Sequence, residues 1–217
     1  MDDQTWTAVD AWWTGTLHAP DPTLDAATAD SAAAGLPPIA VSASLGKFLH
    51  LLAQSIGARR ILEIGTLGGY STIWLARALP PGGELITCEI DAKHAAVART
   101  NLERAGVASV VDLREGPAID TLAALTGPFD LAFVDADKQS GADYFAECLR
   151  LSRPGGLIVV DNVVRAGKVV DDASTDAAVL GTRRLAAAVA AEPRVEATVL
   201  QTVGTKGYDG FLLARVR

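Results

Sequence analysis

The chain has 217 residues, of which 49% are hydrophobic and 21% are charged, and its formal net charge is −7. This length and composition fit a globular protein with a full hydrophobic core. The negative charge argues against binding to nucleic acid or to an anionic membrane surface, so neither is expected as a partner.

The N-terminus and the cysteines indicate an intracellular protein. Met1-Asp2-Asp3 is acidic and lacks the basic and apolar regions of a secretory signal. No apolar run reaches the ~18 residues that span a bilayer. Cys88 and Cys148 form no CxxC motif, and we expect both to be buried, reduced thiols. The sequence therefore predicts a cytoplasmic protein.

The first 40 residues are interpreted as a helical extension of one domain that spans residues 1–217. Trp6, Trp12 and Trp13 are three of the four tryptophans, and the last two share helical spacing with Val9. Either this helix docks on the protein's own core, or its rings line a substrate pocket or a dimer interface, where tryptophan is enriched. A second, alanine-rich helix and an extended proline-containing linker are predicted to follow.

Five strands alternate with helices after residue 41, and two further strands close the chain. The apolar runs, capping residues and turns predict helices at 42–57, 71–79, 92–105, 119–125, 141–151 and 175–191, and strands at 61–64, 85–89, 110–114, 129–134, 157–160, 195–203 and 210–216. Pro154-Gly155-Gly156 predicts a turn before the fifth strand. The pattern predicts an open α/β sheet with right-handed connections and an antiparallel edge.

The chain is organised around its first strand and the glycine-rich turn that follows. Glu63 interrupts an otherwise apolar strand, and G-x-x-G-G begins at Gly65. Glycine permits positive φ and lets a ligand approach the main chain, although such a turn can also be a simple connection. The buried charge of Glu63 needs a partner, which a cationic ligand or a network of backbone N–H groups would supply.

Polar residues follow four of the five predicted parallel strands. Gly65 follows the first strand, Glu89 ends the second, Asp135 ends the fourth, and Asp161-Asn162 end the fifth. Each acid alone could be a helix cap or lie in a solvated loop. Because ligands of open parallel sheets bind beyond the carboxyl ends of the strands, the four together predict a ligand site.

Glu89 indicates a nucleoside cofactor. An acid at the end of the second strand, 24 residues after Gly65, is positioned to accept hydrogen bonds from ribose hydroxyls. It could instead cap the next helix, as Asp91 could. NAD sites use the same acid, but the G-x-x-G-G spacing argues against a pyrophosphate, which favours G-x-G-x-x-G.

Asp135, Asp161 and Asn162 form a candidate metal site. Oxygen ligands without histidine or cysteine suit Mg²⁺, Mn²⁺ or Ca²⁺ rather than Zn²⁺, although these residues could also be helix caps and an Asx-turn. Lys138 lies three residues after Asp135, and a short helical turn would put both on one face. The lysine is either part of a weak surface ion pair or a catalytic base.

The three histidines fit no motif. His18, His50 and His94 are interpreted as structural or solvated residues. No G-x-S-x-G elbow, H-E-x-x-H helix or P-loop lysine is present.

Several short motifs occur together from about Ile39 to the C-terminus. They are Leu62-Glu63-Ile64-Gly65-Thr66 with Gly69-Tyr70-Ser71, Glu115-Gly116-Pro117-Ala118, Val134-Asp135-Ala136-Asp137-Lys138, and Asp161-Asn162. In this combination the chain resembles the cation-dependent, S-adenosylmethionine-dependent O-methyltransferases of the caffeoyl-CoA and catechol type. The resemblance implies a Rossmann-like class I methyltransferase fold, with a seven-stranded, mostly parallel sheet, an antiparallel last strand and helices on both faces. It also implies a homodimer.

The resemblance implies a role for each matching residue. The implied cofactor-binding residues are Val41, Glu63, Gly65, Thr66, Ser71, Glu89, Ala118, Asp135 and Asp137; the implied metal ligands are Asp135, Asp161 and Asn162; and the implied catalytic residues are Lys138 and Asp135. The methionine part of S-adenosylmethionine would contact Glu63, Gly65 and Ser71, and its ribose would contact Glu89. The implied reaction transfers a methyl group to a hydroxyl of a catechol-like aromatic diol, and leaves S-adenosylhomocysteine.

The chain departs from the plant enzymes after Asn162. There, 163–167 replace a loop that contacts substrate in those enzymes, so the resemblance does not identify the acceptor. Two alternatives stay open at this point. One is an NAD-dependent oxidoreductase on a similar sheet, and the other is a protein that binds the cofactor without catalysis.

Overall fold

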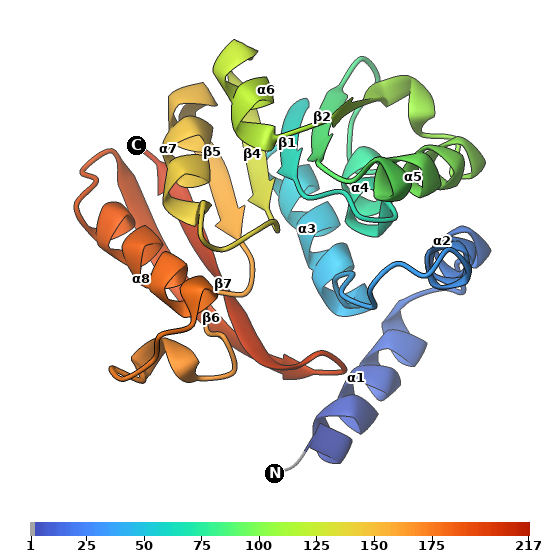
Figure 1. Cartoon of the computed structure of the whole chain (residues 1–217). Helices are drawn as coiled ribbons and strands as arrows, with labels where there is room; N and C mark the ends of the chain where they lie inside the picture. The colour runs from blue at the N-terminus through green and yellow to red at the C-terminus, as the bar shows by residue number, and fades with distance from the viewer. Residues whose placement is uncertain (1–2) are drawn as a thin grey trace.

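The computed structural model describes residues 3–217 and shows a twisted sheet covered by helices on both faces (Figure 1). The helices are α1 (Asp3–Leu17), α2 (Pro22–Ala33), α3 (Ala43–Ser55), α4 (Tyr70–Ala76), α5 (Ala92–Arg104), α6 (Ala118–Ala124), α7 (Gly141–Leu151) and α8 (Ala177–Ala190), with short 3₁₀ helices η1 (Ala108–Val110) and η2 (Lys168–Val170). The strands are β1 (Arg60–Ile64), β2 (Glu84–Glu89), β3 (Val111–Glu115), β4 (Phe129–Val134), β5 (Ser152–Val160), β6 (Val195–Gly204) and β7 (Gly207–Val216). Each predicted helix and strand is therefore present.

The seven strands follow the order β3-β2-β1-β4-β5-β7-β6. Only β7 runs antiparallel to its neighbours, which confirms the prediction of a mostly parallel sheet with an antiparallel last strand. The expected antiparallel edge is also confirmed, with β7 between β5 and the edge strand β6. In the parallel half, Ile64 pairs with Val134 and Val134 with Val160, so β1, β4 and β5 end close together.

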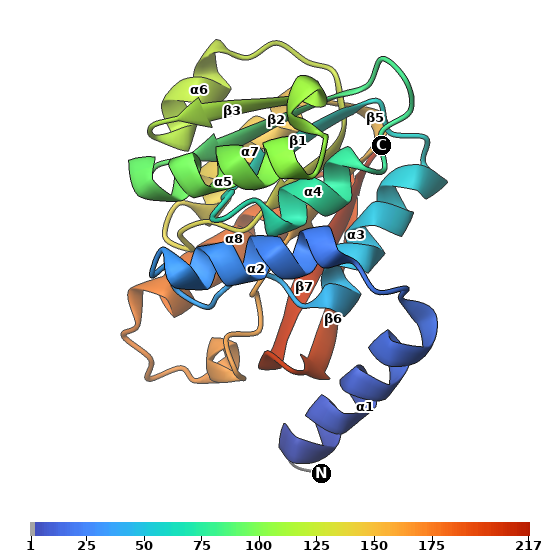
Figure 2. The same ribbon diagram turned by 90° about the vertical axis from the view of Figure 1, so that its right-hand side faces the viewer.

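Two clusters of apolar side chains fill the space between the sheet and its helices. Leu62 and Ile64 pack with α6, α7 and α8 on one face. Ile61 points to the other face and packs with α2, α3, α4 and α5, which Figure 2 shows in front of the sheet. Because neighbouring strand residues alternate between faces, Glu63 lies on the same face as Ile61. Strand alternation thus places this carboxylate beneath α4.

The predicted turn at Pro154-Gly155-Gly156 is wrong, because these residues lie inside β5. Ser152 pairs with Phe129, and the register then shifts before Leu157 pairs with Leu131. Residues 153–156 of β5 thus lie opposite the single residue Asp130, and among them Gly155 takes the left-handed region at φ +80°, as in a large bulge. The turn signal thus marks an irregularity within a strand.

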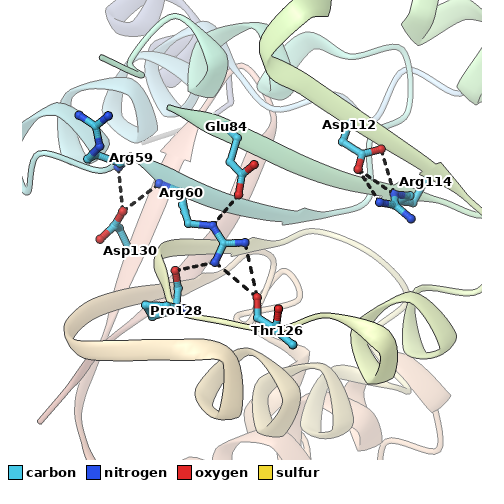
Figure 3. A network of polar contacts seen from close by, with 8 residues as sticks. All are labelled: Arg59, Arg60, Glu84, Asp112, Arg114, Thr126, Pro128 and Asp130. Carbon is cyan, nitrogen blue, oxygen red and sulfur yellow. Dashed lines mark hydrogen bonds and ion pairs between the residues drawn. The ribbon is translucent and has the colours of Figure 1, made fainter. Parts of the chain in front are cut away.

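A polar network joins the strands at their amino ends, away from the predicted site (Figure 3). The Asp130 carboxylate accepts hydrogen bonds from the backbone N–H groups of Arg59 and Arg60 at 2.7 and 2.8 Å. The Arg60 guanidinium bonds Glu84 on β2 and the carbonyl of Pro128 ahead of β4. These bonds fix the register of the central strands whose other ends carry the candidate site.

The N-terminal helices differ in how they pack. In α1, Trp12 and Trp13 are 61% and 50% exposed, so the prediction that this helix docks them on the core is wrong. Figure 1 shows α1 reaching away from the body beside the β6–β7 hairpin. By contrast, α2 buries Leu24 and Ala27 in the core, and Asp21 pairs with Arg77 of α4. Only α1 therefore has the character of an extension.

The cysteines and two histidines have the structural roles expected of them. Cys88 and Cys148 are buried and unpaired, and burial raises the pKa of both thiols, for Cys88 to about 12. His50 forms a hydrogen bond with the backbone carbonyl of Trp74 at 3.0 Å, and His18 packs against the indole ring of Trp74. Across residues 3–217, the helices are all too short or too polar to cross a membrane.

Candidate active site

A cavity of about 890 Å³ opens at the carboxyl ends of the parallel strands. The predicted site residues in its wall are Val41, Gly65, Thr66, Ser71, Glu89, Ala118, Asp135, Asp137, Lys138 and Asn162. A cavity of this size accommodates a nucleoside cofactor together with a small acceptor. Two predicted residues, Glu63 and Asp161, are buried behind this wall instead.

The glycines of the turn after β1 let the protein pack against itself. Gly65 has φ +99°, and a Cβ there would lie 2.2 Å from the carbonyl oxygen of Asp135. A Cβ on Gly68 would lie 2.0 Å from the hydroxyl of Ser31, and Gly69 has φ +85° against Ala98. The sequence predicts either the approach of a ligand to this turn or a simple connection between two elements. In the structure, the glycine spacing brings α2, α5 and the end of β4 against the turn.

Glu63 is fully buried, and its partners are hydroxyl groups. Ser71 donates to Oε1 at 2.7 Å, while Thr72 and Thr87 donate to Oε2 at 2.5 and 2.7 Å. The prediction of a cationic ligand or backbone N–H groups as partner is therefore wrong, because three side chains from α4 and β2 satisfy the carboxylate. Ser71 lines the cavity, so Glu63 reaches the site through this serine.

Burial gives Glu63 a pH-dependent effect on stability. Desolvation, opposed by the three hydroxyls, raises its pKa from 4.5 to about 7. The folded protein thus keeps the Glu63 proton to a higher pH than the unfolded chain does. The free energy of unfolding therefore falls by at most about 3 kcal/mol as the pH rises from the unfolded pKa of 4.5 through the folded pKa of about 7. We expect Glu63→Gln to abolish this loss, so that the stability of the variant relative to wild type increases from pH 4.5 to 7.5. Urea unfolding across this range measures it.

Glu103→Gln is the matched control, because Glu103 is exposed on α5. Its stability should follow the wild-type pH dependence. Parallel curves for wild type and Glu63→Gln would contradict the role assigned to Glu63.

Glu89 anchors the turn and faces the cavity. Its Oε2 accepts the backbone N–H groups of Thr66 and Leu67 at 3.3 and 2.8 Å. The cap of α5 is Asp91, so the prediction of Glu89 as a mere helix cap does not apply. His94 also lines the cavity, with Nδ1 3.6 Å from Glu89 Oε1. Its place in the cavity wall was not predicted, although its position five residues after the acid, in the first turn of α5, was an available signal.

Asp135 and Lys138 form a largely buried ion pair. Lys138 Nζ donates to Asp135 Oδ1 at 2.9 Å, and their side chains are 14% and 21% exposed. The interpretation as a weak surface pair is therefore wrong. The expected helical turn is also absent, because residues 135–138 form an irregular loop between β4 and α7. This loop nevertheless keeps the lysine beside the acid in the cavity wall.

Asp137 is held by a tyrosine that sequence reasoning missed. Tyr144 donates its hydroxyl to Oδ1 at 2.7 Å, and the Ser140 N–H donates to Oδ2 at 3.0 Å. Burial alone would raise the pKa of Asp137, but these bonds outweigh it and lower the pKa below its usual value. Tyr144 lies seven residues after Asp137, in the first turn of α7, and also lines the cavity.

The three predicted metal ligands lie at the ends of β4 and β5. Asp161 is 6% exposed and accepts the N–H of Asn162 at 2.8 Å. Burial first, and then the charge of Asp135, raise the pKa of Asp161, so the two carboxylates are close enough to repel one another. Asn162 takes the left-handed region at φ +57°, which asparagine tolerates better than most residues.

This donor set fits a hard divalent cation. Two repelling carboxylates and an amide oxygen at one place are the ligands that Mg²⁺ or Ca²⁺ favours, and a cation would relieve the repulsion. Within residues 3–217 no group of three or more histidines, cysteines, aspartates or glutamates suits a metal. The predicted set has only two acids and takes its third oxygen from Asn162, so the metal site stays a prediction.

Comparison with known proteins identifies the family. Residues 17–216 match the O-methyltransferase family. A catechol O-methyltransferase of Niastella koreensis is 54% identical over 221 residues, covering 100% of both chains, and one of Mycobacterium tuberculosis is 55% identical over 210 residues, covering 96% of this chain and 95% of the relative. An O-methyltransferase of Bacillus cereus, solved in complex with S-adenosylhomocysteine, is 53% identical, covers 100% of both chains and has a TM-score of 0.98.

The family match begins at residue 17, ahead of the position near Ile39 where the resemblance of motifs was placed. It therefore includes α2, in agreement with the packing of that helix in the core. Neither the NAD-dependent oxidoreductase nor the non-catalytic protein is favoured by these relatives. The chain belongs to the O-methyltransferase family, which confirms the prediction of an S-adenosylmethionine-dependent O-methyltransferase.

Proposed function

We propose that the protein transfers the methyl group of S-adenosylmethionine to one hydroxyl of an aromatic vicinal diol, with a divalent cation at Asp135, Asp161 and Asn162. The observation that carries this proposal is that Asp135, Asp161 and Asn162 follow the paired ends of β4 and β5, with Lys138 bonded to Asp135 in the wall of a cofactor-sized cavity. The names of two relatives of similar length, both catechol O-methyltransferases, support the acceptor class.

The residues divide the work along the cavity. Glu89, fixed by the turn after β1, binds the ribose, while Ser71, held by Glu63, faces the methionine part. When bound, S-adenosylmethionine supplies an electrophilic methyl group on a sulfonium. The surrounding acids favour this positive charge and fix its position relative to the acceptor.

The metal end of the cavity prepares the acceptor. A cation held there would lower the pKa of a diol hydroxyl and orient both oxygens. Lys138, once its ammonium has lost a proton to solvent, accepts the proton that this hydroxyl releases as the new oxygen–carbon bond forms and the sulfur–carbon bond breaks. Asp135 positions Lys138 through their 2.9 Å contact.

Methyl transfer from labelled S-adenosylmethionine tests the proposal. Aromatic vicinal diols should be methylated in Mg²⁺, and EDTA should lower the rate by about 10²–10³-fold, because metal-ion catalysis contributes several kcal/mol. Single phenols with otherwise equal substituents are the acceptor controls. Transfer that survives EDTA would remove the metal from the mechanism, and transfer to phenols but not to diols would overturn the acceptor class.

Two further proposals concern the working form of the enzyme. Helix α1 contacts the edge strand β6, and both expose apolar side chains: Trp12 and Trp13 on α1, and Leu200 and Val203 on β6. Such an exposed apolar surface supports a homodimer. Sedimentation velocity gives the assembly mass. The unpaired, buried thiols of Cys88 and Cys148 support a reducing compartment such as the cytoplasm.

A further inference from the structure

A second cavity, of about 550 Å³, lies beside the candidate active site. Arg165 lines both cavities, and the predicted metal ligand Asn162 also lines the first. The second cavity also contains Lys168 and Lys206 in its wall. Arg165 therefore lies between the candidate active site and a wall that carries two further positive charges.

The two acids of this cavity are engaged by the backbone. Asp209 Oδ1 accepts the N–H groups of Val164 and Arg165 at 3.0 and 2.9 Å. Asp176 caps α8 and accepts the N–H of Ala178 at 2.8 Å. These bonds use the acids to fix the loop and the helix around the cavity, and the wall still carries one more positive than negative charge.

The cations of the second cavity make no direct contact with a carboxylate, although, after the backbone N–H of Ala178, the charges of Lys168 and Arg165 help to lower the pKa of Asp176. Among the residues that the structure describes, Arg165, Lys168 and Lys206 take part in no ion pair, and Lys206 bonds only the carbonyl of Pro38. Arg165 Nε is buried without a hydrogen-bond partner. A buried donor of this kind is costly unless a ligand satisfies it.

The backbone holds Arg165 in this position at an energetic cost. Arg165 and Ala166 both lie in the left-handed region, at φ +57° and +53°, and Gly167 follows at +82°. Residues other than glycine adopt this region only where their surroundings impose it, which is most common at functional sites. Here the constraint comes from the hydrogen bonds that the N–H groups of Val164 and Arg165 donate to Asp209.

We propose that Arg165 determines acceptor specificity by binding a carboxylate on the side chain of the aromatic diol, in the second cavity with Lys168 and Lys206. This inference rests on the proposed function and adds a substrate class to it. A guanidinium binds a planar carboxylate through two parallel hydrogen bonds, which would satisfy the buried Nε. The acceptor is thus an anionic catechol.

Two acceptors that differ only in charge test this inference. The wild-type enzyme should have a kcat/KM about 10–100-fold higher for 3,4-dihydroxycinnamate than for its methyl ester. This is the preference expected from a charge-assisted hydrogen-bonded pair between Arg165 and the carboxylate, which the ester cannot form. Arg165→Gln should bring this ratio close to one, chiefly through the KM of the acid. Arg194→Gln is the matched control, because Arg194 is 66% exposed just before β6, at the end of that strand away from Gly204 and Lys206. It should keep the wild-type ratio.

Binding of S-adenosylhomocysteine and thermal unfolding confirm that each variant is folded. A wild-type ratio near one, or a ratio that Arg165→Gln leaves unchanged, would overturn the inference while leaving the proposed function intact. If neither compound nor any other diol is methylated, the proposed function fails and this inference fails with it.

Discussion

Replacing Asp161 by asparagine is expected to lower methyl transfer by about a thousandfold, while S-adenosylhomocysteine binding changes less than about threefold. The carboxylate lies behind the cavity wall at the end of β5, close enough to Asp135 for their charges to interact. Asparagine has nearly the same shape and retains an oxygen for the N–H of Asn162. It removes one negative charge from the candidate metal site and leaves the cofactor-binding wall intact.

Steady-state kinetics in Mg²⁺ and titration calorimetry with S-adenosylhomocysteine separate these two effects. Asp112→Asn is the matched control, since Asp112 is 49% exposed on β3 and pairs only with Arg114. The control should retain wild-type turnover. Full activity in Asp161→Asn would exclude this residue as a metal ligand, and loss of cofactor binding in a folded variant would show that Asp161 serves the other half of the cavity.

The apolar periodicity of the sequence predicted the strands well because burial on both faces of a parallel sheet leaves a local record. The exceptions arise where tertiary pairing overrides local signals. Gly155 belongs to a strong turn signal, yet pairing with β4 draws its segment into β5 as a bulge. Helical spacing of Trp12 and Trp13 predicted a helix, but spacing alone does not show which surface covers an apolar face.

The candidate site was predictable to the extent that it follows strand ends. Acids such as Glu89 and Asp135 stand out because charge is unusual directly after an apolar run, and both line the cavity. The partners of Glu63 were not predictable, because Thr87 is 24 residues away and hydroxyl residues are common on any strand. Arg165 was missed for a related reason, since only the folded loop brings it between two cavities.

The glycine turn after β1 offers the second large effect, because Gly65→Ala is expected to reduce both stability and activity. Its Cβ would lie 2.2 Å from the carbonyl oxygen of Asp135 in a residue with φ +99°. The left-handed conformation costs about 1–2 kcal/mol, and forced displacement of packed backbone about 1–3 kcal/mol more. Since the atom displaced belongs to Asp135, a shift of the metal and lysine end should also lower kcat/KM by about a hundredfold.

Gly106→Ala separates the clash from the conformational cost. Gly106 has φ +69° after α5, but a Cβ there would have no neighbour within 4 Å. We expect this control to lose only about 1 kcal/mol and to keep wild-type activity. Urea unfolding and methyl-transfer kinetics on both variants measure the difference. Equal losses of stability would mean that the turn tolerates a side chain at residue 65. A loss of activity in Gly65→Ala without extra loss of stability would assign the glycine to the approach of the cofactor rather than to the packing of β1 against the end of β4.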